Sequence, residues 1–403
     1  MIATRSPRPA AVAAPPLHPV LLGVALVLLA VNLRTTVGSL PPLLSHVERD
    51  LGLSGAAAGL LTAVPVICMA WAAPAAHRVA HRYGREATAL ASVVLIAIGN
   101  GVRLEGMHAP VLFGGTFLAG LGIAACGVVL PGIVKELFEG REGRASAMYI
   151  VAMMIGAGVA GAVSVPLEGL LGSWSNALAA WALPAILAAV VWVPVVARLN
   201  ERESEEESHP GRLPLRSRPA WLLAAFFSAQ ASIAYAYMAW LSPAYEARGW
   251  SAASAGLLFG VYNLMQFVTA LVLPTLADRS SDRRPVILFA VGLTTLGSLW
   301  LWALPEVLPW AAVVTIGLGL GGGFSLALLV VVDYSTDPGA SSRLAAMVFL
   351  VGYSAGAVVP VITGALRDAT GGFGLPFGLL AAVAVAQLLV ATRLSPVNRG
   401  TVS

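Results

Sequence analysis

The sequence predicts an all-helical membrane protein whose twelve transmembrane helices form two six-helix, pseudo-symmetric halves. Three observations carry this prediction. Hydrophobic residues make up 58% of the chain and charged residues 11%, whereas a soluble domain carries about 25% charged residues. Apolar stretches of roughly 20 residues recur along the chain, which is the length of a spanning helix and about twice that of a barrel strand. Short segments of the first half also recur in the second half at one fixed spacing.

Charged or Pro/Gly-rich breaks divide the apolar stretches into spans. We expect spans near residues 19–45, 54–79, 86–105, 109–136, 144–168, 174–198, 219–246, 251–277, 284–304, 308–333, 341–367 and 373–393. The halves are then residues 19–198 and 219–393, joined by a polar linker at 199–218 that is rich in Glu and Arg. Residues 1–18 and 394–403 are expected to be cytoplasmic tails. The first of these could pass for the front of a signal peptide, but eleven more spans follow the first span.

The distribution of basic residues predicts the orientation. With a cytoplasmic N-terminus, Arg34 falls inside the membrane and only four of the 24 lysine and arginine residues fall outside: Arg49, Arg103, Arg248 and Arg367. Basic residues favour the cytoplasmic side of membrane proteins. We therefore expect a multi-pass protein of the cytoplasmic membrane with both termini inside. The net charge of +4 reflects this orientation and predicts no nucleic-acid partner.

The repeat within the chain has an offset of 197 residues. It pairs Leu53–Leu61 with Trp250–Leu258, Ala80–Arg82 with Ala277–Arg279, and Gly120–Gly122 with Gly317–Gly319. Three matches at one spacing indicate a duplicated six-span unit. Two parallel copies are related by an axis along the membrane normal, an arrangement that can expose one central site to each side in turn.

Several kinds of chemistry have no support in the sequence. The two cysteines, Cys68 and Cys126, lie in apolar segments without metal-ligand spacing, so we expect buried apolar side chains and no metal site. The run Gly317-x-Gly319-x-x-Gly322 lacks the strand–turn–helix context of a nucleotide site, and its use is helix packing. No phosphate-binding loop or nucleophile–base pair occurs. The chain is expected to be no enzyme and to hold no cofactor.

Arg34 is the strongest candidate for a binding residue. It lies about fifteen residues into the first span, roughly 22 Å along the helix, too deep to reach the membrane surface easily. A charge at this depth is costly and indicates function. No Asp, Glu or His lies at mid-membrane to pair with it, which favours a water-filled cavity and an anionic or strongly dipolar ligand over pairing with backbone carbonyls. Asn32 is a secondary candidate, because helical spacing places it on the opposite face.

Other spans offer polar and aromatic side chains near mid-depth. Asn263 and Gln266 are three residues apart and suit a polar ligand, although contacts between helices explain them nearly as well. The other candidate binding residues, for each of which packing is the alternative, are Gln230, Tyr237, Trp240, Tyr353, Tyr149 and Met153.

The chain resembles the major facilitator superfamily in its cytoplasmic loops. Asp278-Arg279 followed by Asp282-Arg283-Arg284 is similar to the loop motif of that family. The first copy, His81-Arg82-Tyr83-Gly84-Arg85, departs from it because His81 stands where the family has Asp. The resemblance implies the major facilitator fold and a gating role for Arg82, Arg85, Asp278, Arg279 and Arg283. Simple anchoring by positive charge is the alternative.

A narrower resemblance, to the cyanate and 2-nitroimidazole transporter family, covers nearly the whole chain. It rests on these segments: Asn32-Leu33-Arg34, Leu130–Lys135, Ala239–Pro243, Gly317–Phe324 and Gly364–Gly371. The resemblance implies alternating-access transport of a small polar solute. We expect a small anion bound by Arg34, moved by uniport, by exchange, or together with a proton that the substrate itself carries.

Two other functions stay open at this point. One is efflux of neutral or weakly basic drugs such as nitroimidazoles, although the fifth span lacks the Gly-Pro-x-x-Gly-Gly pattern of proton antiporters. The other is a membrane sensor that transports nothing. The expected partners are a small-molecule substrate and the lipid bilayer, with a monomer as the working expectation.

Overall fold

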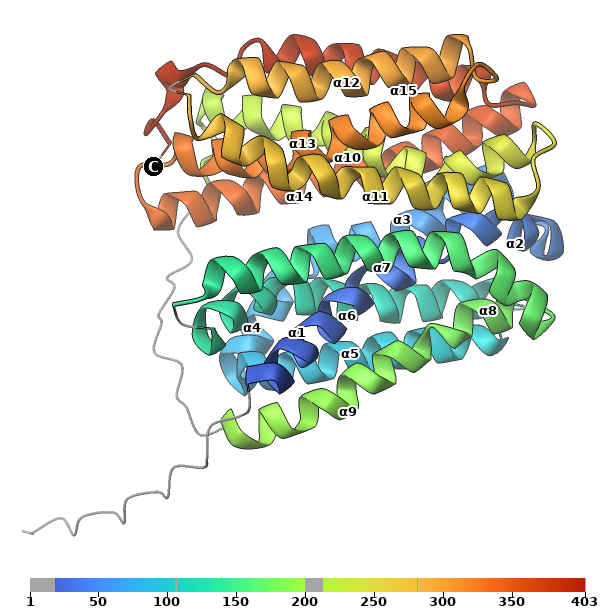
Figure 1. The fold of residues 1–403 in the computed structure, drawn as a ribbon, viewed down its shortest axis with the longest axis horizontal. Helices are drawn as coiled ribbons and strands as arrows, with labels where there is room; N and C mark the ends of the chain where they lie inside the picture. The colour runs from blue at the N-terminus through green and yellow to red at the C-terminus, as the bar shows by residue number, and fades with distance from the viewer. Residues whose placement is uncertain (1–18, 106–107, 139, 200–212, 281, 403) are drawn as a thin grey trace, which may run out of the picture.

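The computed structural model describes residues 19–105, 108–138, 140–199, 213–280 and 282–402. These residues are almost entirely helical, and the helices form two bundles, one for each half of the sequence (Figure 1). The expected N-terminal tail and most of the expected linker lie outside the described residues. The C-terminal tail is held against the end of α13, where Val402 N donates to Tyr334 O at 2.9 Å.

The first bundle contains the helices of residues 19–199. They are α1 (Pro19–Gly38), η1 (Pro41–Leu43), α2 (Leu44–Leu51), α3 (Gly55–Trp71), α4 (Ala73–Tyr83), α5 (Arg85–Val102), η2 (Arg103–Glu105), α6 (Ala109–Leu137), α7 (Glu142–Leu171), α8 (Trp174–Ala180) and α9 (Ala182–Leu199).

The second bundle contains the helices of residues 218–398. They are α10 (Arg218–Glu246), α11 (Ala252–Ala277), α12 (Arg284–Ala303), α13 (Pro309–Tyr334), α14 (Pro338–Thr370), α15 (Gly374–Ala391) and η3 (Pro396–Asn398). We call the end of the molecule where α9 ends and α10 begins the linker end, and the opposite end the α2 end.

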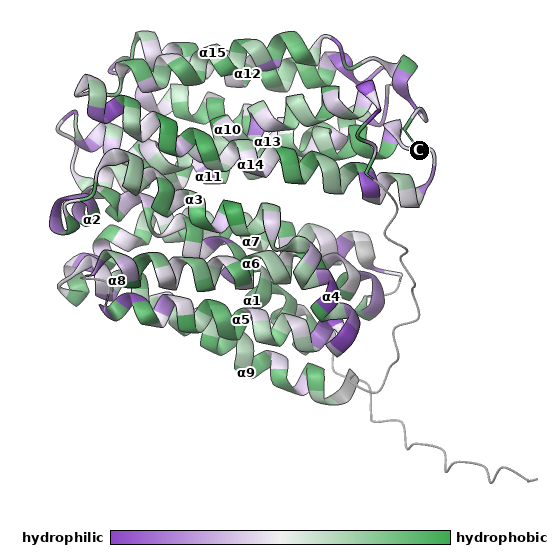
Figure 2. Cartoon of the chain, turned by 180° about the vertical axis from the view of Figure 1, so that it is seen from behind, coloured by the Kyte–Doolittle hydropathy of each residue, from purple (hydrophilic) through white to green (hydrophobic). Residues whose placement is uncertain are grey.

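The described residues contain eleven helices long and apolar enough to cross a membrane, and the pair α3–α4 makes a twelfth span. Hydrophobic residues run along both bundles, whereas hydrophilic ones gather at the two ends (Figure 2). Large apolar side chains such as Leu183 and Leu389 are more than 60% exposed. An apolar surface of this kind fits contact with lipid rather than water.

Three of the expected spans contain a break in the helix. The first breaks at Pro41-Pro42, which begin η1, because proline has no amide hydrogen to donate. The second bends by 56° between α3 and α4, at Ala72, two residues before Pro74. The sixth is interrupted at Trp181, between α8 and α9. The number and order of the spans agree with the prediction.

Helix starts in the two bundles follow the repeat. The Ser54 side chain accepts a hydrogen bond from Ala57 N at 3.2 Å and begins α3. Ser251, at the equivalent position of the second copy, accepts from Ser254 N at 3.2 Å and begins α11. Such a cap contributes about 1 kcal/mol to its helix. The same local signal therefore starts the second span of each half.

Two helix pairs, α3 with α14 and α7 with α11, join the bundles. Small residues let their backbones approach closely. A side chain at Gly59 would overlap the Pro360 carbonyl, and a Cβ at Gly260 would lie 3.1 Å from Gly158 O. These approaches lie from mid-bundle toward the α2 end, where the ribbons of the two bundles also come closest (Figure 1).

Candidate functional site

A small cavity of about 50 Å³ lies between the bundles at mid-depth. Arg34 and Tyr235 are its polar lining residues. The apolar and sulfur-containing residues around them are Leu33, Val37, Pro65, Val66, Met69, Ile123, Gly127 and Met153. Every lining residue except Tyr235 belongs to the first bundle. The cavity therefore combines one positive charge with a mostly apolar wall.

Arg34 is half-buried and forms no hydrogen bond or ion pair with any described residue. No described carboxylate lines the cavity. A guanidinium inside a membrane protein with no acidic partner is suited to an anionic ligand.

The polar residues on the opposite face of α1 hold the first bundle together. Asn32 is fully buried and donates to Leu28 O at 2.7 Å and to Pro184 O at 3.1 Å. One turn on, Asn100 donates to Thr36 Oγ1 at 3.0 Å. Asn32 and Arg34 therefore serve different surroundings, which is the division that helical spacing predicts. Asn32 does not line the cavity.

The candidates on α10 face the interior of the second bundle rather than the cavity. Gln230 donates to Leu320 O at 2.6 Å and accepts from Gln387 Nε2 at 2.6 Å. The Tyr237 ring packs against Phe377, with 5.6 Å between centroids. Trp240 Nε1 donates to Pro360 O at 2.9 Å. These contacts turn the face expected to bind a ligand toward neighbouring helices.

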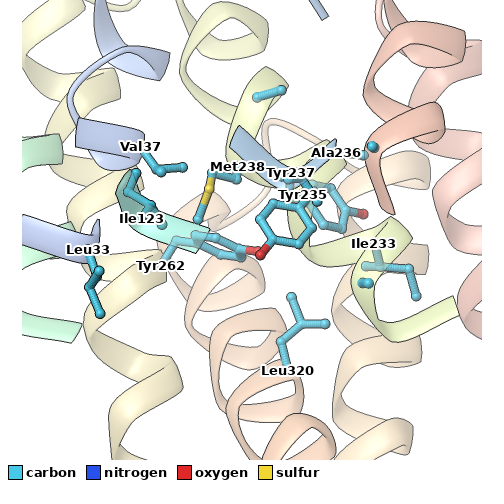
Figure 3. Packing of buried hydrophobic residues seen from close by; sticks show 14 of the residues in the cluster. Leu33, Val37, Ile123, Ile233, Tyr235, Ala236, Tyr237, Met238, Tyr262 and Leu320 are labelled. Atoms are coloured by element: carbon cyan, nitrogen blue, oxygen red, sulfur yellow. The ribbon is translucent and has the colours of Figure 1, made fainter. Parts of the chain in front are cut away.

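Tyr235 is the α10 residue that sequence reasoning missed. Its ring lies on the side of the residues Leu33, Val37 and Ile123, whereas the Tyr237 ring points away from them (Figure 3). The repeat offset could have identified it. That offset matches Arg34 with Ala231, and Tyr235 lies one helical turn beyond Ala231 on the same face.

The candidates on α11 bond mainly to their own helix. Asn263 donates to Phe259 O at 3.0 Å, and Gln266 donates to Tyr262 O at 3.5 Å. Met153 on α7 lines the cavity, while Tyr149 is half-buried one turn away. Of the residues expected to bind a ligand, the structure thus brings Arg34 and Met153 together at the cavity.

Tyr353 belongs to an aromatic cluster next to the cavity. It stacks on Phe349 with centroids 5.6 Å apart and an interplanar angle of 22°, and it meets Tyr235 edge-on at 6.2 Å. Phe227 packs against Phe324 at 5.9 Å and against Phe349 at 5.3 Å. These rings form one aromatic cluster that extends from Tyr235, the ring that lines the cavity, into the second bundle.

At the linker end, the expected gating residues form ion pairs within each bundle. Arg85 pairs with Glu136 at 3.2 Å in the first. In the second, Arg283 contacts Asp278 at 3.1 Å and Asp333 at 2.7 Å. Glu136 and Asp333 are equivalent in the repeat, so each half ties a loop arginine to the same position.

The other charged loop residues at this end contact their own loop or solvent. Arg82 lies over the Tyr83 ring at 5.5 Å, and Arg279 is exposed. The loop residue Asp282 binds Arg284, with Arg284 Nη2 donating to Asp282 Oδ2 at 2.7 Å. Hydrogen bonds from the Arg284 side chain lower the pKa of Asp282 below its usual value.

At the α2 end, ionic contacts cross between the bundles. Arg367 Nη1 donates to both carboxylate oxygens of Glu48, at 2.6 and 2.8 Å. The next residue, Asp368, accepts from Gly55 N at 3.0 Å and from Ala56 N at 3.3 Å, at the start of α3. A carboxylate at a helix N-terminus is favourable. We call these two contacts the outer latch; sequence reasoning did not find them.

The outer latch borders an open pocket at the surface of the α2 end. Its volume is about 420 Å³. The lining residues are Ser45, Glu48, Arg49, Leu53, Gly55, Pro243, Glu246, Ala247, Arg367 and Asp368. Residues of both latch contacts, Glu48, Arg367 and Asp368, therefore line this pocket. Within the described residues, no group of three or more His, Cys, Asp or Glu side chains could hold a metal ion.

Comparison with known proteins places this architecture in a family. The sequence model of the Major Facilitator Superfamily matches residues 20–360 and 232–402. The chain belongs to the major facilitator superfamily. It is 31% identical over 373 residues to the cyanate transport protein CynX of Escherichia coli K12, covering 93% of this chain and 97% of that protein. It is 29% identical over 375 residues to the 2-nitroimidazole transporter of the same organism, covering 92% and 94%.

Solved structures agree on the fold. A mutant form of the nucleoside transporter NupG matches with a TM-score of 0.74 at 13% identity, over 93% of this chain and 99% of that one. The D-xylose–proton symporter matches with a TM-score of 0.73 at 14% identity, over 95% and 98%. At identities this low, the similarity shows the fold alone. With its family and relatives, the chain is a multi-pass membrane transporter of small solutes and not an enzyme.

Proposed function

We propose that this transporter moves a small anion and that Arg34 is its central binding charge. The observation that carries the proposal is the unpaired guanidinium: Arg34 lines a cavity between the bundles and has no acidic partner among the described residues. An unpaired charge at this depth is costly. A bound anion offsets that cost, which gives an anion an advantage over a neutral or cationic solute.

The proposed mechanism is alternating access. The outer latch and the glycine contacts close the α2 end, whereas the ion pairs described at the linker end stay within single bundles. This pattern supports a state closed on one side of the site and poised to open on the other. We infer that the linker end faces the cytoplasm, from the basic residues expected there, and that the protein lies in the cytoplasmic membrane.

The charges around the cavity also limit coupling to protons. No described Asp, Glu or His lines it, so the described part of the chain offers no proton carrier beside the substrate. We therefore propose uniport or exchange, or symport in which the substrate brings its own proton. Transport of an anion that does not protonate near neutral pH, such as nitrate, should not depend on an imposed pH gradient.

The proposal is tested with purified protein in liposomes and a panel of small anions: cyanate, nitrate and formate. Wild-type protein should be stabilised by at least one of them and should transport it. Arg34→Ala should lose both responses, and Arg34→Lys should retain part of them because the charge remains. Arg393→Ala, an exposed arginine just after α15, is the matched control and should behave as wild type. Equal responses in wild type and Arg34→Ala would overturn the proposal.

A second candidate function is efflux of a neutral planar solute. The aromatic cluster of Phe349, Tyr353 and the cavity residue Tyr235 favours it, because aromatic faces bind flat conjugated molecules. The relative named as a 2-nitroimidazole transporter adds support. Liposomes distinguish the two functions: transport of 2-nitroimidazole that survives Arg34→Ala would favour the neutral solute.

A further inference from the structure

Among the described residues of the second bundle, Tyr235 is the one that lines the cavity at Arg34. We propose that its hydroxyl donates a hydrogen bond to the bound anion, so that the substrate joins the two halves of the transporter. This inference rests on the proposed function and adds a specific residue to it. Arg34 then holds the anion from the first half and Tyr235 holds it from the second.

Among the described residues, the Tyr235 hydroxyl has only a weak hydrogen-bond partner. It points to Met69 Sδ at 4.0 Å, and a thioether sulfur is a poor acceptor. The neighbouring Tyr262, in contrast, donates to Ala234 O at 2.9 Å. Tyr235 can therefore exchange its sulfur contact for an oxygen or nitrogen acceptor of a ligand and lose little by doing so.

The packing around Tyr235 holds its ring in place. The side chain is 8% exposed. A Cβ at Gly356 would lie 3.1 Å from Tyr235 Cδ2, so the ring lies directly against the α14 backbone. The Tyr353 ring meets it edge-on at 6.2 Å. A donor that is already fixed in position loses little conformational entropy when the ligand binds.

A ligand contact from the second half matters for transport as well as affinity. A ligand can shift a conformational equilibrium only by its difference in affinity for the two states. An anion bound by the first half alone would have the same contacts in every relative position of the halves. A bond from Tyr235 exists only when the second half is in place, and this links substrate binding to the movement of the halves.

The volume of the cavity limits the size of the anion that can bind there. A water molecule needs about 10–15 Å³ of such volume, so a cavity of about 50 Å³ has space for roughly four non-hydrogen atoms. Guanidinium groups bind two acceptor atoms side by side, and Tyr235 requires a further lone pair. A small anion with several acceptor atoms, such as nitrate or formate, meets both conditions.

The inference is tested with Tyr235→Phe, which removes only the hydroxyl. Affinity for cyanate, nitrate and formate is measured by titration calorimetry, and exchange is measured in liposomes. Loss of a hydrogen bond to a charged ligand should weaken affinity roughly 10- to 100-fold and slow exchange. Tyr245→Phe is the matched control: it lies on the same helix, is buried, and donates to Pro305 O at 2.8 Å within the second bundle. It should keep its affinity within about twofold.

Thermal unfolding of Tyr235→Phe without ligand separates ligand binding from packing, because the substitution keeps the ring and removes only a contact to a weak sulfur acceptor. The stability of the ligand-free variant should match that of wild type. Lower stability than wild type would show that the hydroxyl serves the contact between the halves and would overturn the inference. Unchanged affinity and exchange in Tyr235→Phe, with both lost in Arg34→Ala, would overturn the role of Tyr235 alone. No response to any anion by wild type would overturn the proposed function and this inference together.

Discussion

Replacing Glu48 by glutamine is expected to shift the protein toward a state that is open at the α2 end. Glu48 accepts two hydrogen bonds from Arg367 across the two bundles, at 2.6 and 2.8 Å. Arg367 also lies over the Trp240 and Phe373 rings, at 5.3 and 5.2 Å, within its own bundle. The arginine therefore stays in position when its partner loses charge, and the substitution removes mainly the contact between bundles.

The burial of the pair sets the magnitude. The side chain of Glu48 is 9% exposed and that of Arg367 is 28% exposed. Breaking a fully buried pair costs about 3–5 kcal/mol, but solvent screens a pair as exposed as this one. A hydrogen bond to a charged group contributes about 1.5–3 kcal/mol. We take the low end, about 1.5–2 kcal/mol, which corresponds to a ten- to thirtyfold change in the equilibrium between states.

The shift is measured as a distance between spin labels by double electron–electron resonance. Labels at Glu105 and Glu306, exposed positions in different bundles at the α2 end, report the separation of the halves there. The protein for labelling lacks the two native cysteines, Cys68 and Cys126, both of which are buried. Glu48→Gln should increase the population of molecules with long distances between the labels. Addition of 2-nitroimidazole or an anion should shift the distance distributions of wild type and Glu48→Gln in the same direction.

Asp50→Asn is the matched control, because Asp50 lies on the same helix but accepts from Trp174 Nε1, at 2.7 Å, within the first bundle. Its distances should match those of wild type. The exchange of charges, Glu48→Arg with Arg367→Glu, should recover part of the short-distance population that Arg367→Glu alone loses. Identical distances in wild type and Glu48→Gln, or no recovery in the exchanged pair, would refute the latch.

Two further predictions concern packing. Asn32→Ala and Gln230→Ala should each lower stability by about 0.5–2 kcal/mol, because both side chains join helices within one bundle. Thermal unfolding in detergent measures this loss, and a large drop in anion affinity at intact stability would instead place the residue at the site. Gly59→Ala should open the α2 end, because the added methyl group meets the Pro360 carbonyl of the other half. The same spin labels report it, and a wild-type distance distribution would count against the close contact.

The sequence was sufficient for the features that depend on local composition. Membrane spans require long apolar stretches, and these are visible without any knowledge of packing. The absence of an acid near Arg34 could be read from the chain because a membrane leaves few places for charge. Helical spacing also separated Arg34 from Asn32, since the direction of a side chain along one helix depends only on its position.

The sequence could not predict how each helix is rotated about its own axis. The face of α10 that carries Gln230 and Tyr237 is as polar as a binding face, yet it points into the second bundle, and Tyr235 lies at the cavity instead. In a membrane, polar side chains serve as contacts between helices as readily as ligands. Composition cannot tell these uses apart, because only the neighbouring helices determine which face meets the cavity.

By itself, the sequence determined the class of protein, the number and order of its spans, and the one charge at their centre. The tertiary structure determined which residues from distant parts of the chain contact one another. Arg367 and Glu48 are separated by 319 residues, and Tyr235 reaches the cavity lined by Arg34 from the other half of the chain. The physical reason is that local pattern specifies a helix and its depth in the membrane, whereas contacts between distant helices depend on how all of them pack at once.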